Sequence, residues 1–239
     1  MSDFKPTLLF YGYIARNIVY SNVKKYANTC SGVLLDFGCG SKPYKHLFNC
    51  KTYIGIDYNG EGHSHKNEQI DVFYDGITIP CLDNSFDSIF SCEVLEHVYN
   101  FKEMVKELNR VLKPGGTFLL ICPFSYAEHE TPVDYFRYTS FGISKTLKEA
   151  GFEIVLQKKL GNAVQTLCQY FLSYISTHIT CKLGVLGNIL ISIISLFVNT
   201  ISVVSKFIPS QELYLDNLII CKKIIKPLHY SIRQKHQML

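Results

Sequence analysis

The stretch Val33-Leu34-Leu35-Asp36-Phe37-Gly38-Cys39-Gly40-Ser41 is an apolar run that leads into two glycines one residue apart. Glycines at the end of a strand let the backbone turn tightly and approach a ligand closely. The next apolar run, Tyr53-Ile54-Gly55-Ile56-Asp57-Tyr58, ends near an acid about twenty residues after the glycines, where a carboxylate can accept hydrogen bonds from a nucleotide ribose. The two runs predict neighbouring strands that hold a nucleotide-like ligand.

The glycine loop also bears on the kind of ligand. A loop that binds a nicotinamide dinucleotide usually reads G-x-G-x-x-G, but Pro43 occupies the third glycine position here. Asp36, near the end of the first run, would repel a pyrophosphate and attract an ammonium group, directly or through water. The loop therefore favours a nucleoside with a positive charge. The alternative is an ordinary strand-to-helix turn with incidental acids.

Short apolar runs alternate with helical patterns along the chain. Runs bounded by Gly, Asp, Asn or Pro predict strands at Val33–Phe37, Thr52–Ile56, Gln69–Phe73, Phe86–Phe90, Thr117–Cys122, Phe152–Gln157 and Tyr214–Cys221. Helical spacing predicts a helix over Phe101–Leu112, capped by Asn100 and stopped by Pro114-Gly115-Gly116, and a second helix over Ser140–Ala150. Strands separated by helices predict an α/β fold with a parallel sheet and right-handed crossovers.

Several blocks follow the glycine loop in order. They are Asp36-Phe37-Gly38-Cys39-Gly40, Asp57, Asp75-Gly76-Ile77-Thr78-Ile79-Pro80, Asn84-Ser85-Phe86-Asp87-Ser88-Ile89, Glu93-Val94-Leu95-Glu96-His97-Val98 and Arg110-Val111-Leu112-Lys113-Pro114-Gly115-Gly116. In this combination, residues 30–160 resemble the class I methyltransferases that use S-adenosylmethionine, in particular the type 11-like group. The resemblance implies a methyltransferase enzyme with a seven-stranded Rossmann-like sheet. Its antiparallel last strand, Tyr214–Cys221, would follow an apolar helical insertion.

The resemblance also implies which residues hold the cofactor S-adenosylmethionine. These are Asp36, Gly38, Cys39 and Gly40 at the methionine part, Asp57 and Tyr58 at the ribose, Asp75 and Gly76 at the adenine, and Glu93 near the reacting centre. The chain departs from the family pattern at Lys42, which stands where the fuller motif has a third glycine, so the loop after Gly40 must differ in shape. His63 and His65 lack further ligands nearby, and no metal site is expected.

The segment from Pro123 to Thr139 follows the fifth strand and is rich in aromatic and ionisable residues. Ligands bind outside the carboxyl ends of strands in such sheets, so this segment is expected to hold the methyl acceptor. Its His129 is the candidate catalytic base, because a histidine has an ordinary pKa near neutrality. The alternative is a structural network of His129, Asp134 and Arg137. His97 is expected to be structural.

The pattern His129-Glu130-x-Pro132-x-Asp134-x-x-Arg137-Tyr138-Thr139 resembles methyltransferases of bacterial surface-polysaccharide and glycolipid pathways. This resemblance favours O-methylation of a sugar, glycan or glycolipid intermediate. A quinone or lipid-type acceptor is the nearest competing substrate class. A methyltransferase-like binding module without catalysis is the competing interpretation outside the enzymes. The intact Asp36, Asp57 and Asp75 argue against that module.

Composition narrows the remaining classes of protein. Of the 239 residues, 47% are hydrophobic and only 18% are charged, which excludes a disordered chain or a coiled coil. The net charge of +4 is too small to indicate a nucleic-acid partner by itself, and the basic residues do not cluster around the expected site. Nine scattered cysteines without a C-x-x-C pair and an N-terminus without a signal-peptide pattern predict a cytoplasmic protein with reduced thiols.

The segment 161–208 is the most apolar part of the chain and lies between a predicted core at 1–160, which includes an N-terminal helix, and a last strand with a basic tail at 211–239. From Gly161 to Ser205 there is no Asp or Glu, and Lys182 is the only Lys or Arg. Polar residues recur every three or four positions at Gln165, Gln169, Ser173, Ser176 and Thr180, and then at Asn188, Ser192, Ser195, Asn199, Ser202 and Lys206. This spacing predicts two helices within 161–210, each with one narrow polar stripe, that Gly184 and Gly187 separate.

Three environments suit these two helices. They could lie at a membrane surface, form a soluble cap or dimer interface, or span a bilayer, since about 20 apolar residues suffice to cross it. Spanning is disfavoured because the strand Tyr214–Cys221 must return to the cytosolic sheet. A peripheral position at the cytosolic face of a membrane is preferred. The basic residues Lys222, Lys223, Lys226, Arg233 and Lys235 would add attraction to anionic lipid.

Overall fold

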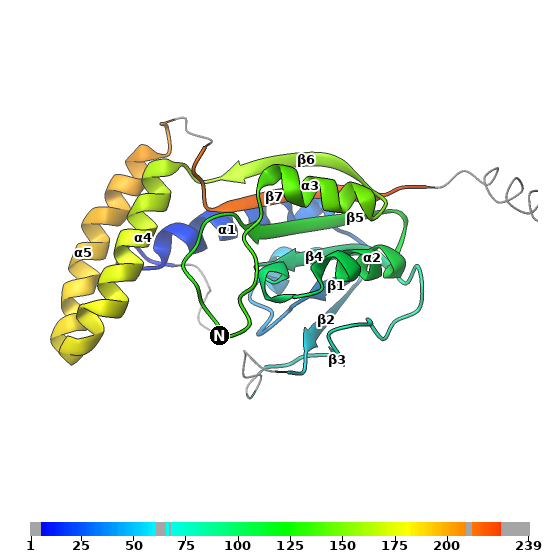
Figure 1. The fold of residues 1–239 in the computed structure, drawn as a ribbon, viewed down its shortest axis with the longest axis horizontal. Helices are drawn as coiled ribbons and strands as arrows, with labels where there is room; N and C mark the ends of the chain where they lie inside the picture. Colours follow the sequence, from blue (N-terminus) through cyan, green and yellow to red (C-terminus); the bar gives the residue numbers. More distant parts are fainter. Residues whose placement is uncertain (1–5, 61–65, 67, 209–211, 226–239) are drawn as a thin grey trace, which may run out of the picture.

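The computed structural model describes residues 6–60, 66, 68–208 and 212–225. Within these ranges, seven strands form one sheet in the order β3-β2-β1-β4-β5-β7-β6. The strands are β1 Val33–Phe37, β2 Thr52–Tyr58, β3 Val72–Tyr74, β4 Phe86–Cys92, β5 Leu112–Pro123, β6 Phe152–Leu160 and β7 Asp216–Lys223. The first five pair in parallel, whereas β7 runs antiparallel to β5 and β6 (Figure 1). This topology confirms the predicted fold.

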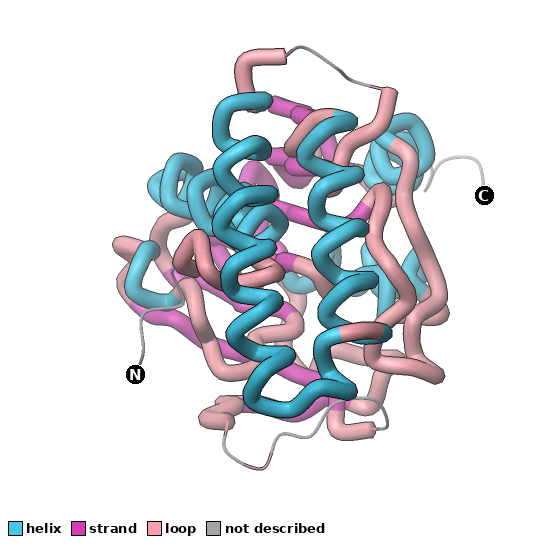
Figure 2. The backbone as a smooth tube through the Cα atoms, turned by 90° about the vertical axis from the view of Figure 1, so that its left-hand side faces the viewer, coloured by secondary structure: helices cyan, strands magenta, loops and turns pink. Residues whose placement is uncertain are grey.

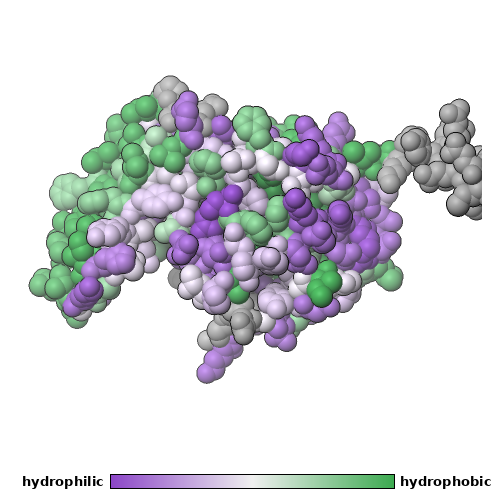
Figure 3. Space-filling view, in the orientation of Figure 1, coloured by the Kyte–Doolittle hydropathy of each residue, from purple (hydrophilic) through white to green (hydrophobic). Residues whose placement is uncertain are grey.

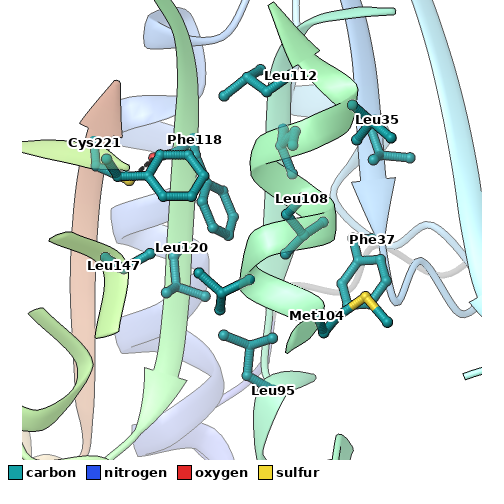
Figure 4. Packing of buried hydrophobic residues seen from close by; sticks show 14 of the residues in the cluster. Leu35, Phe37, Leu95, Met104, Leu108, Leu112, Phe118, Leu120, Leu147 and Cys221 are labelled. Atoms are coloured by element: carbon teal, nitrogen blue, oxygen red, sulfur yellow. Dashed lines mark hydrogen bonds between the residues drawn. The ribbon is translucent and has the colours of Figure 1, made fainter. Parts of the chain in front are cut away.

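Helices cover both faces of the sheet. On one face lie α2 (Phe101–Val111) and α3 (Ser140–Glu149), and on the other lies α1 (Tyr13–Tyr26). Figure 4 shows Met104 and Leu108 of α2 between side chains of β1 and β5, all of them fully buried. Short 3-10 turns complete this part of the chain at η1 Ala27–Thr29, η2 Lys45–Leu47 and η3 Leu95–His97. The alternation of apolar strands and amphipathic helices therefore builds two cores around one sheet.

Two local predictions about α2 are corrected. Strand β5 begins at Leu112, directly after the helix, and the pairing with β4 skips from Phe86–Leu112 to Ser88–Thr117. The segment Pro114-Gly115-Gly116 thus interrupts the β5 ladder, as expected where proline has no N–H to donate, and does not stop the helix. Asn100 occupies the cap position without a capping bond, because its side-chain amide donates to the Gly76 carbonyl at 3.2 Å.

The apolar segment forms a helical hairpin, here called the α4–α5 hairpin. Helices α4 (Ala163–His178) and α5 (Gly184–Ser205), joined by η4 (Thr180–Leu183), lie side by side beyond the carboxyl ends of β5 and β6 (Figures 1 and 2). Gly184 adopts a φ of 55° at the break, as predicted. The prediction for Gly187 is wrong: this residue lies inside α5, and a Cβ there would come within 1.8 Å of the Thr180 carbonyl oxygen. Gly187 therefore lets the hairpin close tightly.

The polarity of the hairpin is inverted relative to the sheet core. The Asn199 side-chain amide, which is buried, donates to the carbonyls of Leu8 and Phe10 at 2.7 and 3.0 Å. On α4, the buried Gln169 Oε1 accepts from the Ala15 amide at 3.1 Å. Large apolar side chains face outward instead, including Leu167, Phe171, Val185, Leu186, Ile189, Ile193, Phe197, Ile201 and Val204. This outward surface gives the hydrophobic patch at the hairpin end of the molecule (Figure 3).

Candidate functional site

A cavity of about 670 Å³ opens at the carboxyl ends of β1, β2 and β4. Seven of the nine predicted cofactor residues line it: Gly38, Gly40, Asp57, Tyr58, Asp75, Gly76 and Glu93. The cavity is also lined by side chains from η3 and from the segment between β5 and α3, which was predicted to hold the acceptor. The structure therefore joins the two predicted subsites in one space.

The glycine turn brings the backbone to the cavity wall. Gly38 has a φ of 76°, and a Cβ at this position would lie 2.2 Å from a methyl carbon of Val94. Gly40, with a φ of 43°, donates its amide to Asp57 Oδ2 at 2.7 Å. A side chain at Gly38 would therefore clash, and the predicted ribose-binding carboxylate fixes the turn from the next strand.

The adenine end of the cavity is formed by a turn after β3. Asp75 Oδ1 accepts from the amides of Ile77 and Thr78, both at 2.8 Å, and these hydrogen bonds lower the pKa of Asp75. The Tyr58 ring lies against Gly76, where an added Cβ would be 3.0 Å from it. The predicted ribose and adenine residues are thus neighbours in space, although sixteen or more positions separate them in the chain.

Asp36 and Cys39 differ from the other predicted cofactor residues because they lie beneath the loop and do not line the cavity. The Asp36 carboxylate accepts a hydrogen bond from the Tyr53 hydroxyl at 2.5 Å. Burial raises the pKa of Asp36 to about 7, against the opposing effect of that hydrogen bond. Lys42, the departure from the family motif, has a φ of 55° and pairs with Asp71 at 2.7 Å. Asp36 therefore does not face the cavity and can affect a bound ligand only through the glycine loop above it.

Three carboxylates with buried oxygen atoms lie beside the cavity. Glu93, which is half-buried, directly follows β4, whereas Glu96 on η3 and Asp216 at the start of β7 are buried. Among the described residues, Glu93 Oε1, both Glu96 oxygens and Asp216 Oδ2 have no hydrogen-bond partner. Burial raises the pKa of Glu93 to about 7 against the opposing charge of Arg137, and burial together with the other carboxylates raises the pKa values of Glu96 and Asp216 further. Burial and mutual repulsion therefore favour the protonated form of these carboxyl groups.

The network proposed around His129 is present. Arg137 donates to both carboxylate oxygens of Asp134, at 2.5 and 2.7 Å, and Asp134 Oδ2 also accepts from the His129 amide at 2.9 Å. Although burial opposes it, these contacts hold the pKa of Asp134 at about 2. His97, expected to be structural, lines the cavity, and the two histidine rings lie 4.8 Å apart. His129 itself does not line the cavity, and of the two histidines only His97 does.

Sequence reasoning missed Glu96, His97 and Asp216 as members of the site. Glu96 and His97 stand inside a quoted motif block, but their shared burial with Asp216 depends on β7 being inserted between β5 and β6. The signal that could have drawn attention to Asp216 is an acid at the start of a continuous apolar strand, where a carboxylate needs a reason to be buried. The histidines His63 and His65 lie outside the described residues.

Comparison with known proteins supports the class implied by the motifs. Residues 35–120 match the profile of a family described as "Methyltransferase domain". A Mycolicibacterium smegmatis protein described as "probable S-adenosylmethionine-dependent methyltransferase" is 28% identical over 158 residues, covering 60% of this chain and 60% of that protein. A demethylmenaquinone methyltransferase of Corynebacterium efficiens is 38% identical over 69 residues, covering 29% and 27%. The chain therefore spans 60% or less of these relatives' length.

Solved structures show the same fold at low identity. A Bacillus halodurans C-125 protein described as a methyltransferase aligns with a TM-score of 0.51 and 17% identity, covering 86% of this chain and 99% of that one. The [4+2]-cyclase SpnF aligns with a TM-score of 0.55 and 16% identity, covering 89% and 82%. A phosphoethanolamine N-methyltransferase 2 of Haemonchus contortus, solved with S-adenosylmethionine bound, aligns with a TM-score of 0.51 and 18% identity, covering 87% and 53%. The cyclase shows that this fold can carry another function.

The fold is thus the Rossmann-like methyltransferase fold. Residues 35–120 match a methyltransferase domain, and proteins described as S-adenosylmethionine-dependent methyltransferases or solved with S-adenosylmethionine bound are among those to which the chain is similar. The chain's own residues fit that cofactor, because an acid at the ribose position, an acid at the adenine position and a glycine turn all border one cavity.

Proposed function

We propose that this protein transfers the methyl group of S-adenosylmethionine to an oxygen of a sugar, glycan or glycolipid intermediate. The observation that carries the proposal is the single cavity that runs from Asp57 and Asp75 to the aromatic residues of the acceptor side. Methyl transfer requires the acceptor oxygen to approach the methyl carbon in line with its bond to sulfur while water is kept out. One continuous cavity allows both molecules to be held at that distance.

The acceptor side suits a hydroxylated ligand with apolar faces. Tyr99 and Tyr135 line the cavity with their rings 5.3 Å apart in an edge-to-face arrangement, and both rings are exposed. Glu130 from the same segment also lines the cavity. Aromatic rings pack against the apolar face of a sugar while carboxylates accept from its hydroxyls, and this combination favours a sugar over a wholly apolar acceptor.

Deprotonation of the acceptor hydroxyl is assigned to the histidine side of the cavity, with His129 as the proposed base. Its Nδ1 lies 3.2 Å from the Ala127 carbonyl and 3.3 Å from Asp134 Oδ2. In the tautomer that donates from Nδ1 to these acceptors, Nε2 carries the lone pair that a base needs, while the Arg137 guanidinium also lies 3.5 Å from Nδ1. His97, whose ring lies 4.8 Å from that of His129, lines the cavity.

We further propose that the α4–α5 hairpin rests on a membrane surface. The segment Ala163–Ser205 contains a window with a mean hydropathy of 2.1 that is only 17% buried, whereas a core helix of a soluble protein is mostly buried. Its polar stripe is turned toward the protein, and its apolar side chains face outward. A helix with one face packed on protein and the other apolar is suited to the boundary between lipid headgroups and acyl chains.

The hairpin also contacts the acceptor segment. Ser125 Oγ and Tyr170 Oη are within hydrogen-bond distance at 3.2 Å, and Tyr126 packs against the cluster of Ile14, Leu172, Ile191 and Leu215. A membrane under the hairpin would therefore lie close to the acceptor side of the cavity. This juxtaposition favours a lipid-linked glycan over a free sugar. A quinone or other lipid acceptor would use the same membrane surface, and it remains the competing substrate class.

The test is to incubate the protein with methyl-labelled S-adenosylmethionine and a membrane extract of its own host. The proposal expects label in a lipid-linked glycan whose sugar carries the new methyl group. Label in a quinone, a sterol-like lipid or a protein would contradict the acceptor assignment. Cofactor binding without transfer to any fraction would instead support a non-catalytic binding module.

Two variants belong in the same experiment. Asp57→Ala removes a hydrogen-bonding charged group, so cofactor affinity should fall by about 1.5–3 kcal/mol, or roughly 10- to 150-fold. His129→Ala should lower turnover by about 100-fold with little change in cofactor affinity, if His129 is the base. His46→Ala, which removes an exposed histidine outside the cavity, is the matched control. Unchanged turnover in His129→Ala would contradict the base assignment.

A further inference from the structure

Glu96 is the least expected side chain in the molecule. It is fully buried on η3, and neither of its carboxylate oxygens has a hydrogen-bond partner among the described residues. Burying a carboxylate without a partner is costly, and native proteins avoid it unless a charge or a ligand compensates. The function proposed above does not use Glu96. Its burial therefore calls for a compensating group that the protein chain does not supply.

Two histidines present lone pairs beside this carboxylate. His97 Nδ1 lies 2.8 Å from the Val133 carbonyl, so Nδ1 carries the proton and donates it. Its Nε2 is then unprotonated and lies 3.8 Å from Glu96 Oε1. In His129, the tautomer that donates from Nδ1 to the Ala127 carbonyl has its lone pair on Nε2. In both residues a carbonyl or a carboxylate orients the ring, as is usual for metal-ligating histidines.

The three side chains converge. One ligand atom from each of Glu96, His97 and His129 lies within 4.8 Å of the other two. The histidine rings are nearly perpendicular, at 83°, so their edges can approach one ion from different directions.

Other carboxylates near Glu96 also lack partners. Glu93, which is half-buried, and Asp216, which is buried, each have one carboxylate oxygen with no hydrogen-bond partner among the described residues. The guanidinium in this region, Arg137, is already engaged by both oxygens of Asp134. A divalent cation at the convergence point would neutralise the cluster where the guanidinium does not.

We propose that Glu96, His97 and His129 form a binding site for one divalent transition-metal cation, of which Zn²⁺ is the representative. Two histidines and a carboxylate are a ligand set used for zinc and related ions, and catalytic sites of this kind keep an open position. His97 also lines the cofactor cavity, so the open position would face the acceptor. The use of the ion rests on the proposed function: an acceptor hydroxyl bound there would ionise more readily. His129 would then be a ligand instead of the base: the bound ion would favour the ionised hydroxyl, and the released proton would pass to solvent.

The experiment is a calorimetric titration of the metal-free full-length protein with Zn²⁺, followed by Co²⁺ as a spectroscopic probe. Wild type should bind one ion at this site, and Glu96→Gln and His97→Ala should each weaken it at least tenfold. His46→Ala should bind like wild type. Co²⁺ should give no thiolate charge-transfer band in the near ultraviolet, although the chain has nine free cysteines.

Equal affinity for Zn²⁺ in wild type and Glu96→Gln would overturn the site, as would a thiolate band with Co²⁺. S-adenosylmethionine affinity and thermal unfolding, measured on the same samples, show that the variants are folded. Methyl transfer that proceeds fully in chelator would overturn the proposed use of the ion and leave the proposed function standing. Metal binding without methyl transfer would do the reverse.

Discussion

The sheet core and the α4–α5 hairpin bury opposite kinds of side chain. Between the sheet and helices α2 and α3, the buried residues are almost all apolar, such as Leu35, Phe118 and Leu120. In the hairpin, the buried face of α5 carries Ser195, Asn199 and Ser202, while leucines and phenylalanines face outward. The chain therefore contains one region that buries apolar side chains, as a protein in water does, and one that buries polar side chains and turns apolar ones outward, an arrangement suited to lipid.

This difference shows that the hairpin is not a loosely packed extension of the core. Its polar groups hold α5 to the segment before α1 through directional bonds, as Asn199 does with Leu8 and Phe10. Lipid tails are as apolar as leucine, so burying an apolar side chain between two helices in lipid gives no hydrophobic stabilisation. Small and polar residues hold such helices together instead. The hairpin follows that rule, and the sheet follows the rule for water.

The comparison is tested most strongly by the same truncation in the two regions. Leu120→Ala opens a cavity in the sheet core and should lower the free energy of unfolding by about 2–5 kcal/mol. Leu186→Ala, at an outward position that is 66% exposed, should change it by less than about 0.5 kcal/mol in detergent-free buffer. Urea denaturation of the two variants measures both. A large loss for Leu186→Ala would show that its side chain packs in a soluble core.

The second difference is the pH dependence of stability, because the sheet buries carboxylates and the hairpin buries neutral amides and hydroxyls. The folded-state pKa of Asp36 is raised from 3.8 to about 7, so the unfolded chain releases its proton first as the pH rises. The tighter proton binding of Asp36 in the folded state contributes roughly 4 kcal/mol to the free energy of unfolding. This contribution is fully present below pH 3.8 and is lost by about pH 7. Asp36→Asn should therefore gain stability relative to wild type between pH 4 and pH 8. An identical pH profile in Asp36→Asn and wild type would contradict the burial of a titrating Asp36.

The third prediction concerns the inner stripe of the hairpin. Asn199→Leu leaves the carbonyls of Leu8 and Phe10 without their donor and should lower the free energy of unfolding by about 1–3 kcal/mol. Thr200→Val, one position along and exposed, is the control and should stay within about 0.5 kcal/mol. An Asn199→Leu variant as stable as wild type would contradict the role of these two hydrogen bonds in holding α5. Thermal unfolding of both variants distinguishes these outcomes.

The strands and the cofactor turn could be predicted from the sequence because their signals are local. Val33–Phe37 was predicted with its observed bounds, and Asp57 was placed near the end of the next strand, where it lines the cavity. Each depends only on an apolar run and the residues that end it. Register details such as the interruption at Pro114 depend on the partner strand, and they were not predicted.

The acid and histidine cluster could not be predicted, because its members come from three separate elements. Glu96 and Asp216 are 120 positions apart, and only the insertion of β7 between β5 and β6 brings them together. The hairpin was predicted only in part. The spacing of its polar residues predicted two striped helices, but a period of three to four residues does not say which side of a helix faces the protein.

The central claim is that the outward face of the α4–α5 hairpin meets lipid, and flotation with liposomes tests it most directly. Two triple variants of matched composition replace exposed residues with serine. One changes Leu186, Phe197 and Val204 on the hairpin, and the other changes Leu82, Phe141 and Val155 on the rest of the surface. The membrane account predicts that wild type and the second variant float with liposomes containing anionic lipid, even in high salt, whereas the first loses at least tenfold in binding, because each apolar side chain returned to water costs about 1.5–3 kcal/mol when fully buried. A wild-type protein that stays at the bottom of the gradient, or two variants that float equally well, would contradict the claim.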